Sequence, residues 1–342
     1  MVDRSRRGGA GADGQGDLDV VAIGNALVDV LSEASEQFVR AQGAPKGTMR
    51  LVDEARAQAI YETMGPAIEI SGGSAANTIV GVASFGGRAH YVGKVRDDQL
   101  GAVFAHDLRS TRVGYTTPPA TSGPPTGRCL ILITPDAQRT MHTFLGASVQ
   151  LGPGDLDEGV IARGRILYLE GYLFDPPAAQ EAFRVAAGIA HAAGRKVSLT
   201  LSDPFCVDRH RAAFLDLVEH HVDVLFANEA EICALYQVGD FDTALQQVRR
   251  HCEVAALTRG PRGSIVIGGD DMHVIDAHPV DVLVDTTGAG DLYASGFLFG
   301  LSRGLNLATC GRLGSLAAAE VISHVGARPM LPLAQLAGSL AG

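Results

Sequence analysis

The sequence predicts an α/β protein with three layers, a mostly parallel central sheet flanked by helices, and a small β-stranded lid. From Asp19 onward, short β-branched runs alternate with helical patterns, which is typical of a parallel sheet covered by helices. Two stretches, 46–52 and 116–146, break this alternation with extended patterns of their own. Hydrophobic residues make up 46% of the 342 residues and charged residues 19%, so the chain can bury a sizeable core.

The expected strands of the main sheet are short runs rich in Val, Ile and Leu. In chain order they span residues 20–23, 90–92, 166–169, 197–201, 224–226 and 254–257. The helices between them are indicated by their ends. Asp98 precedes an amphipathic stretch, and Pro176-Pro177 opens a helix that Gly194 ends.

The lid is expected to contain a β-hairpin. Two β-rich runs, 128–134 and 139–145, flank the turn residues Pro135-Asp136-Ala137. We therefore expect one main domain over residues 19–332, with lid segments at approximately 46–52 and 116–146. Residues 1–18 are rich in Gly, Asp and Arg and are expected to be a disordered N-terminal tail.

The composition excludes several classes of partner. The formal net charge of −10 argues against nucleic acid, because such binding depends on clustered Lys and Arg. No segment approaches the ~20 apolar residues that cross a bilayer, and residues 1–18 fit no export signal. We expect a cytoplasmic monomer or homodimer. The five cysteines lack a C-x-x-C spacing and indicate neither disulfides nor a zinc site: Cys129, Cys206, Cys233, Cys252 and Cys310.

The strongest local signal is Gly288-Ala289-Gly290-Asp291, directly before an apolar helical stretch. The glycines let the backbone turn sharply, and the N–H groups and dipole of a helix start favour a bound anion. Asp291 falls in the first helical turn and faces the same space, where it can accept a proton from an attacking hydroxyl. From this segment alone, the alternative that Asp291 only caps the helix is about equally good.

A second glycine-rich turn, Gly72-Gly73, leads from a short extended run at 68–70 into a helix. This turn can present backbone amides to a ligand, with Asn77 one turn into the helix. The alternative is that Ser74 caps the helix and the glycines only make the turn.

Two further polar pairs stand at expected strands. Asn25 and Asp29 are an even number of residues apart, so both face one side of an extended chain. An amide beside a carboxylate suits a vicinal diol, although a strand-end Asp is often only solvated. Asn228 and Glu231 share one face at the start of a helix, which indicates either a metal ion held through water or a helix cap.

Together these motifs resemble the two signatures of the pfkB family of carbohydrate and nucleoside kinases, which have the ribokinase-like fold. Residues 72–101 look like the first signature and residues 285–296 like the second, and the resemblance extends from about Asp19 to Pro329. It implies transfer of the terminal phosphoryl group of ATP to a primary hydroxyl, with Mg²⁺ bound together with ATP. It also makes the capping alternative for Asp291 a minor one.

The resemblance implies a role for each motif on the acceptor side. Asp291 is expected to be the catalytic base, and Gly288, Ala289 and Gly290 the anion hole. The residues expected to bind the hydroxyl groups of the acceptor are Asn25, Asp29, Gly72, Gly73 and Asn77.

On the nucleotide side, Asn228 and Glu231 match an N-x-x-E element associated with magnesium and phosphate, with Glu231 reaching Mg²⁺ through water. Asp285 matches a position tied to monovalent cations such as K⁺ in some members. The loop expected to bind ATP contains Thr258, Gly260 and Gly263.

Within the family, the segments 72–74 and 201–205 are most similar to those of adenosine kinases. Arg139 matches a lid arginine that stabilises the transferred phosphoryl group in those enzymes. This similarity implies adenosine as the acceptor. Phe205 stands just after the end of an expected strand, where α/β sheets bind ligands, so we expect it to be a platform for the purine, with Tyr172 as a second wall. The alternative for Phe205 is packing in the core.

Three other functions are alternatives to an adenosine kinase. Glu170 departs from the apolar residue expected there, and acidic residues occur nearby in sugar kinases of the ribokinase, fructokinase or 2-keto-3-deoxygluconate kinase type. A catalytically silent binding protein is disfavoured by the intact Asp291. A Rossmann dehydrogenase is disfavoured because no G-x-G-x-x-G follows the first strand.

Overall fold

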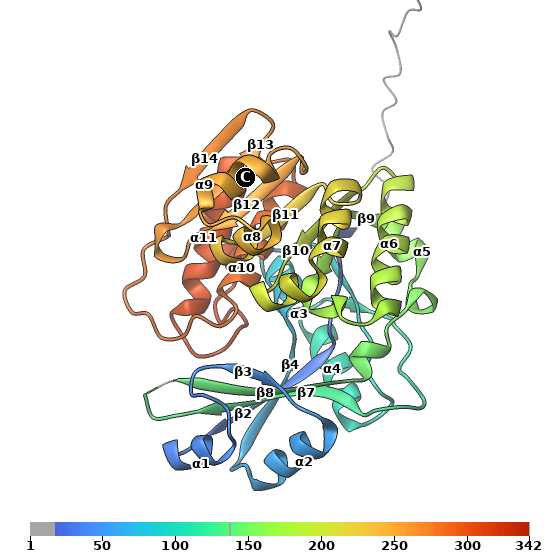
Figure 1. Cartoon of the computed structure of the whole chain (residues 1–342), viewed down its shortest axis with the longest axis vertical. Coiled ribbons are helices and arrows are strands. Elements are labelled where there is room, and N and C mark those ends of the chain that lie inside the picture. The colour runs from blue at the N-terminus through green and yellow to red at the C-terminus, as the bar shows by residue number, and fades with distance from the viewer. Residues whose placement is uncertain (1–17, 137, 342) are drawn as a thin grey trace, which may run out of the picture.

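The computed structural model describes residues 18–136 and 138–341, which form a larger sheet between helices and a smaller sheet beside it (Figure 1). The larger sheet has the strand order β14-β13-β12-β11-β10-β9-β1-β5-β6. The predicted tail lies outside the described residues, except that Leu18 begins β1. The strands of the larger sheet are β1 Leu18–Ile23, β5 Ala89–Val92, β6 Gly114–Tyr115, β9 Gly164–Glu170, β10 Lys196–Thr200, β11 Val224–Asn228, β12 Val254–Thr258, β13 Ser264–Gly268 and β14 Asp271–Ile275.

The six predicted strands are confirmed as β1, β5, β9, β10, β11 and β12, and neighbouring strands among them run parallel. Ile23 pairs with Leu169, Leu169 with Leu199, and Leu199 with Leu225. The carboxyl ends of these strands are therefore level at one edge of the sheet. Strands β13 and β14, which no sequence pattern had indicated, extend the sheet as an antiparallel pair.

Helices cover both faces of this sheet. Side chains alternate between the two faces along each strand, so each strand contributes to an apolar cluster on either face. In β1, Val21 packs in one apolar cluster and Val20 in the other. The first cluster includes side chains from α5 Glu158–Arg163, α6 Pro177–Ala192, α7 Pro204–His220, α8 Glu229–Tyr236 and α9 Phe241–Val248. The second includes side chains from α3 Ser74–Ser84, α4 Gln99–Ser110, α10 Ala289–Ser302 and α11 Leu307–Ile322, and α12 Leu333–Ala337 packs beside the last two.

The helix starts predicted at Asp98 and at Pro176-Pro177 are confirmed. The side chain of Asp98 accepts a hydrogen bond from the N–H of Gly101 and caps α4. Pro177 is the first residue of α6, where its missing N–H costs nothing. No helix in the described part of the chain is both long and apolar enough to cross a membrane. The cytoplasmic location stays a prediction.

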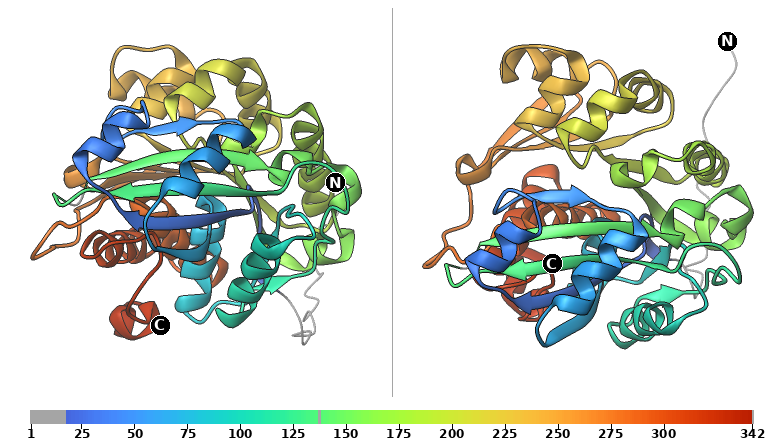
Figure 2. Two further views of the ribbon diagram at one scale, coloured as in Figure 1. Left: turned by 90° about the horizontal axis from the view of Figure 1, so that it is seen from below. Right: turned by 60° about the horizontal axis from the view of Figure 1, so that its bottom comes forward.

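The smaller sheet is the lid, with the strand order β3-β8-β7-β2-β4. Its strands are β2 Leu27–Glu33, β3 Met49–Leu51, β4 Ala67–Gly72, β7 Thr126–Ile133 and β8 Arg139–Gly146. The helices α1 Glu36–Ala41 and α2 Glu54–Thr63 lie on its outer side (Figure 2). The predicted hairpin is confirmed by β7 and β8, which pair Ile133 with Arg139. Its turn residue Ala137 lies outside the described residues.

The lid is larger than predicted, because β2 and β4 also belong to it. The chain leaves β1 at Ile23 and enters β2 at Leu27, so Asn25 lies in the connection and Asp29 in the lid. The prediction that both stand on one extended strand is therefore wrong. The assignment of residues 19–332 to one main domain stays a prediction.

Candidate active site

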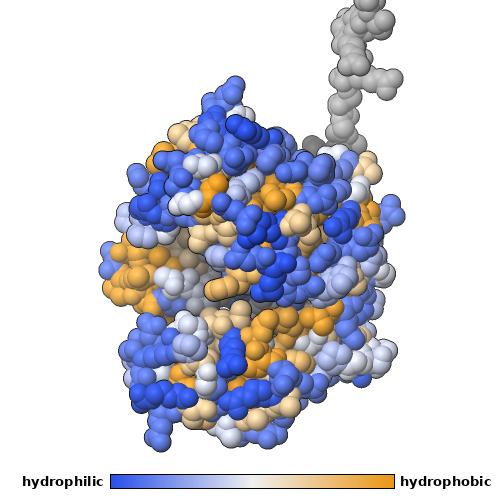
Figure 3. Space-filling model, in the orientation of Figure 1, coloured by the Kyte–Doolittle hydropathy of each residue, from blue (hydrophilic) through white to orange (hydrophobic). Residues whose placement is uncertain are grey.

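A cavity lies between the carboxyl ends of the main-sheet strands and the inner face of the lid, and the surface is hollowed there (Figure 3). This edge of a parallel sheet is where α/β proteins bind ligands. Thirteen of the predicted site residues line the cavity: Asn25, Asp29, Gly73, Asn77, Tyr172, Phe205, Asn228, Glu231, Thr258, Gly288, Ala289, Gly290 and Asp291. Five predicted residues do not line it: Gly72, Arg139, Gly260, Gly263 and Asp285.

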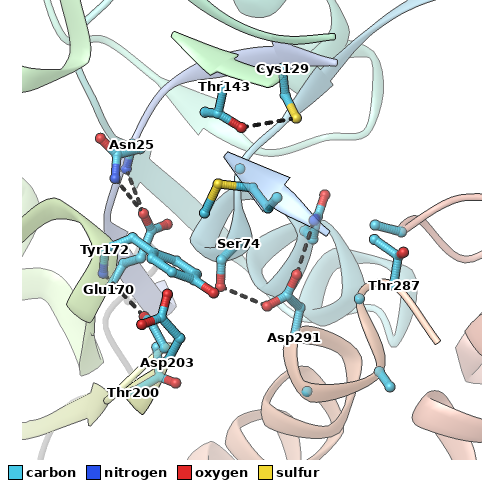
Figure 4. Close-up of a pocket in the computed structure, with 18 of the residues that line it drawn as sticks. Asn25, Ser74, Cys129, Thr143, Glu170, Tyr172, Thr200, Asp203, Thr287 and Asp291 are labelled. Carbon is cyan, nitrogen blue, oxygen red and sulfur yellow. Dashed lines mark hydrogen bonds between the residues drawn. The ribbon is translucent and has the colours of Figure 1, made fainter. Parts of the chain in front are cut away.

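Asp291 is the third residue of α10 and does not cap it. The N-cap is Gly288, whose φ of 80° lies in the left-handed region that glycine adopts readily. The carboxylate of Asp291 instead accepts hydrogen bonds from Ser74 Oγ at 2.6 Å (Figure 4) and from Asn77 Nδ2 at 3.0 Å. Burial raises the pKa of Asp291, and these two hydrogen bonds oppose that rise. The capping alternative is therefore wrong.

Helix α3 brings Ser74 and Asn77 to Asp291 because it packs closely against α10. A Cβ atom on Gly81 of α3 would lie 2.4 Å from the Oγ of Ser295, so only glycine permits this spacing. Ser74 is the first residue of α3 and not its cap, so the alternative that Ser74 caps the helix is wrong. The N-cap is Gly73, with a φ of 99°. The Ser74 hydroxyl is thus available to Asp291.

Glu170, the last residue of β9, bridges the segment after β1 and the start of α3 through hydrogen bonds. Its Oε1 accepts from the backbone N of Asn25 at 3.1 Å and from Asn25 Nδ2 at 2.8 Å (Figure 4), and its Oε2 accepts from Ala75 N at 2.7 Å. The side chain is 1% exposed. Its acidic character, which departed from the expected apolar residue, is explained by these donors.

Burial raises the pKa of Glu170 to about 7, against the hydrogen bonds from Ala75 and Asn25. Asp29 is affected in the same way. Burial raises its pKa to about 6, Arg328 and Arg139 oppose the rise, and Asp291 adds to it. The cavity therefore has acidic groups that titrate near neutral pH.

Asn228 and Glu231 form a complete capping box at the start of α8. The N–H of Glu231 donates to Asn228 Oδ1 at 2.9 Å, and the N–H and Nδ2 of Asn228 donate to the two carboxylate oxygens of Glu231. The capping alternative is confirmed. Contact with Mg²⁺ through water stays a prediction. Within residues 18–136 and 138–341, no cluster of three His, Cys, Asp or Glu could hold a metal ion.

Arg139 connects the lid to the loop before α10. Its Nε lies 3.0 Å from Asp285 Oδ2, and both side chains are almost fully buried. The other contacts of Asp285 are hydrogen bonds from the N–H and Oγ1 of Thr287 and from the N–H of Gly326. Asp285 is therefore already surrounded by donors, and a monovalent cation would have to compete with Arg139. The buried Nη2 of Arg139 has no hydrogen-bond partner among the described residues.

The predicted nucleotide loop is only partly at the cavity. Thr258 ends β12 and lines it, whereas Gly260 and Gly263 form the following turn, with positive φ angles of 57° and 74°. A Cβ on Gly263 would lie 2.0 Å from the carbonyl oxygen of Ile275, so this glycine permits a close backbone approach.

Phe205 is 75% exposed at the start of α7 and lines the cavity, so the alternative of core packing is wrong. Tyr172 lies in the 3₁₀ turn Gly171–Phe174, where its N–H donates to Ser202 Oγ at 3.1 Å. The lid adds an apolar wall that no sequence pattern had indicated, made of Met49, Leu51, Ile131, Met141 and Leu145. The cavity thus combines acidic groups near α3 and α10 with apolar surface from the lid.

Comparison with known proteins agrees with this geometry. An adenosine kinase structure from Sinorhizobium meliloti is 49% identical, covers 94% of this chain and 99% of its own, and superposes with a TM-score of 0.88. A probable sugar kinase from Rhizobium etli CFN 42 is 48% identical, covers 94% and 98%, and gives 0.89. A 5-dehydro-2-deoxygluconokinase from Bacillus anthracis (strain CDC 684 / NRRL 3495) is 25% identical over 92% of both chains.

The covered sheet, the β lid and the carboxylate at a helix start define a ribokinase-like phosphotransferase that acts on a sugar or a nucleoside. Residues 67–334 match the model of the pfkB family of carbohydrate kinases, and the chain belongs to this family.

The buried Glu170 makes stability depend on pH. The folded state binds its proton more tightly than the unfolded chain, because burial raises the pKa from 4.5 to about 7. This contribution to stability is complete below about pH 4.5 and is lost as the pH rises through about 7.

We predict that the melting temperature of the wild type falls more steeply from pH 5 to pH 8 than that of Glu170→Gln, whose side chain does not titrate. The difference between their free energies of unfolding should change by up to about 3 kcal/mol, at ~1.4 kcal/mol per pKa unit. Denaturant titrations across this pH range measure it. The exposed Glu62→Gln should retain the wild-type slope, and equal slopes for all three proteins would contradict the raised pKa.

Proposed function

We propose that this phosphotransferase is an ATP-dependent adenosine kinase that phosphorylates the 5′-hydroxyl, with Asp291 as the catalytic base. The observation that carries the proposal is the placement of Asp291. It lies at the start of α10, faces the cavity, and is held by Ser74 and Asn77. A catalytic base needs this kind of fixed orientation, because it must lie within hydrogen-bond reach of the attacking hydroxyl.

In the proposed reaction the acceptor oxygen bonds to the terminal phosphorus of ATP while the bond from that phosphorus to the bridging oxygen breaks. The hydroxyl proton passes to Asp291, and ADP leaves. Asp291 need not be strongly basic, because the loose transition state of phosphoryl transfer depends more on positioning and charge stabilisation.

The start of α10 supplies donors for the transferred group. The N–H of Ala289, which was predicted to belong to the anion hole, instead donates to Thr286 O at 3.2 Å. The next N–H groups, of Gly290 and Asp291, are left for an anion. Arg139 does not line the cavity, so we propose that its guanidinium, whose Nη2 is unpaired among the described residues, reaches a phosphoryl oxygen only when the lid closes over both substrates.

Mg²⁺ carried by ATP would neutralise phosphate charge, and we assign Glu231 a water-mediated contact with it. Thr258, Gly260 and Gly263 are proposed to border the nucleotide. We expect K⁺ to have little effect, since Asp285 is already paired with Arg139.

The apolar part of the cavity supports a nucleoside acceptor. Phe205 and Tyr172 offer aromatic faces, and the exposed side chains of Met49 and Leu51 offer aliphatic surface. Such surface suits a purine and gains little from a plain sugar. The adenosine kinase from S. meliloti supports the same acceptor.

A sugar kinase is the second candidate, because Glu170 lines the cavity and two of the related proteins are sugar kinases by name. Measuring ADP release with adenosine, guanosine, inosine, ribose, fructose and 2-keto-3-deoxygluconate separates the candidates. Tight binding of one compound without turnover of any would favour a silent binding protein.

We predict that Asp291→Asn retains its fold and its affinity for the acceptor while kcat falls roughly 10²- to 10⁴-fold, the usual effect of removing a general base. Steady-state kinetics with ATP and the preferred acceptor measure this effect. The exposed Asp271→Asn serves as the matched control and should keep wild-type turnover. Full turnover by Asp291→Asn would refute the role of Asp291.

Arg139→Ala should lower kcat by roughly 10²-fold and raise the acceptor KM much less, because a contact made mainly in the transition state contributes little to ground-state binding. A melting curve should accompany the kinetics, since the variant also loses the ion pair with Asp285. Arg50→Ala, another lid arginine, is the control. A change in KM alone would indicate that Arg139 binds the acceptor and does not stabilise the transferred phosphoryl group.

Stacking of a base is worth ~1–3 kcal/mol, so Phe205→Ala should raise the adenosine KM by ~5- to 150-fold. Its effect on ribose or fructose should be small. The control variant Val274→Ala also removes an exposed apolar side chain. It should change neither the KM for adenosine nor the KM for ribose or fructose. If the wild type prefers a base-free sugar and Phe205→Ala leaves that activity unchanged, the acceptor is a sugar.

A further inference from the structure

Arg328 has no part in the mechanism above, yet its guanidinium group touches the segment that carries Asn77. Its Nε donates to Asn77 Oδ1 at 2.8 Å. Its Nη2 donates to the backbone O of Ser71 at 2.6 Å and to Ser71 Oγ at 2.9 Å. Arg328 does not line the cavity, whereas Asn77 does. Arg328 therefore lies outside the cavity, in contact with a residue of the cavity wall.

The contacts with Arg328 and Asp291 together decide which way the Asn77 amide faces. A side-chain amide has one acceptor end and one donor end. Arg328 offers only donors, so it holds the oxygen of Asn77, and Nδ2 is then directed at Asp291 Oδ2, 3.0 Å away. In the reverse orientation the amide oxygen would oppose the Asp291 carboxylate, and the NH₂ group would oppose the guanidinium.

Arg328 itself is held on both sides along the chain. Before it, the N–H of Gly326 donates to Asp285 Oδ2 at 3.2 Å. After it, Glu320 Oε1 accepts from Met330 N at 2.8 Å and from Leu331 N at 2.9 Å. These contacts fix the segment that follows α11, so the guanidinium reaches α3 from a defined backbone position.

Acidic side chains lie near Arg328, so its positive charge has an effect in addition to that of its hydrogen bonds. Asp107 accepts from the N–H and hydroxyl of Ser71, the same residue that Arg328 binds. The positive charge of Arg328 also opposes the rise in pKa that burial causes at Asp29 and Asp291. Replacing Arg328 by a neutral side chain would remove both the cation and the orienting hydrogen bond.

We propose that Arg328 is a positioning residue for phosphoryl transfer, which acts by orienting the Asn77 amide toward Asp291. The proposal rests on the assignment of Asp291 as the base. Because Arg328 acts through Asn77, its effect should appear in kcat and should disappear once Asn77 is removed.

The test is a double-mutant cycle of Arg328→Met with Asn77→Ala, measured as kcat with ATP and the preferred acceptor. Arg328→Met should lower kcat by about 10-fold or more and change the acceptor KM by less than about threefold. In the Asn77→Ala background it should cause almost no further loss. Arg312→Met, an exposed arginine on α11, should be neutral.

Arg328→Lys separates geometry from charge. A lysine keeps the positive charge but cannot reproduce the planar arrangement of donors that binds Asn77 and Ser71 together. It should therefore restore only part of kcat and should also be non-additive with Asn77→Ala. If Arg328→Met does not fold, the same cycle with Arg328→Lys decides the question.

Additive losses, a rise in KM at unchanged kcat, or full rescue by lysine would overturn the proposal. Failure of the proposed function would look different. In that case Asp291→Asn would retain turnover, whatever the result of the cycle. If Asp291→Asn is impaired and the double-mutant cycle is additive, only the proposed role of Arg328 is refuted.

Discussion

The central physical constraint on this structure is the withdrawal of several carboxylates from water around one cavity. A carboxylate that loses hydration needs nearby donors, or it takes up a proton. Two of these acids accept hydrogen bonds from donors in other parts of the chain. Glu170 is met by Asn25 and Ala75, and Asp291 by Ser74 and Asn77. These bonds join the ends of the main-sheet strands to the starts of the helices, and so they set the shape of the site.

Local sequence patterns predicted the features that depend on neighbouring residues. The main strands were recognisable because β-branched runs alternate with capped helices. The Gly288–Asp291 turn was recognisable because two glycines stand directly before an apolar helical stretch. The boundary between the larger sheet and the lid was not recognisable from local patterns. The change from β1 to β2 occurs within Gly24-Asn25-Ala26, and the apolar residues on both sides of Gly24-Asn25 made the two strands look continuous.

The missed features of the site depend on contacts between distant residues. Asn77 and Arg328 are 251 residues apart, and no spacing rule connects them. The same holds for Arg139 and Asp285, whose ion pair forms only because the lid sheet reaches the loop before α10. The sequence indicated that Asp285 and Asp291 mattered, but their partners Arg139, Ser74 and Asn77 came from packing, and the partners decide what each side chain can do.

The lid is assembled from two separate stretches of chain. Strands β2, β3 and β4 come before α3, whereas β7 and β8 come after α4, and β2 lies between β4 and β7 in the sheet. An ancestral protein could not have gained such a lid by one insertion into a finished loop. Exchanging the lid for that of a relative would likewise require two coordinated segment replacements, with the β2–β7 pairing preserved between them.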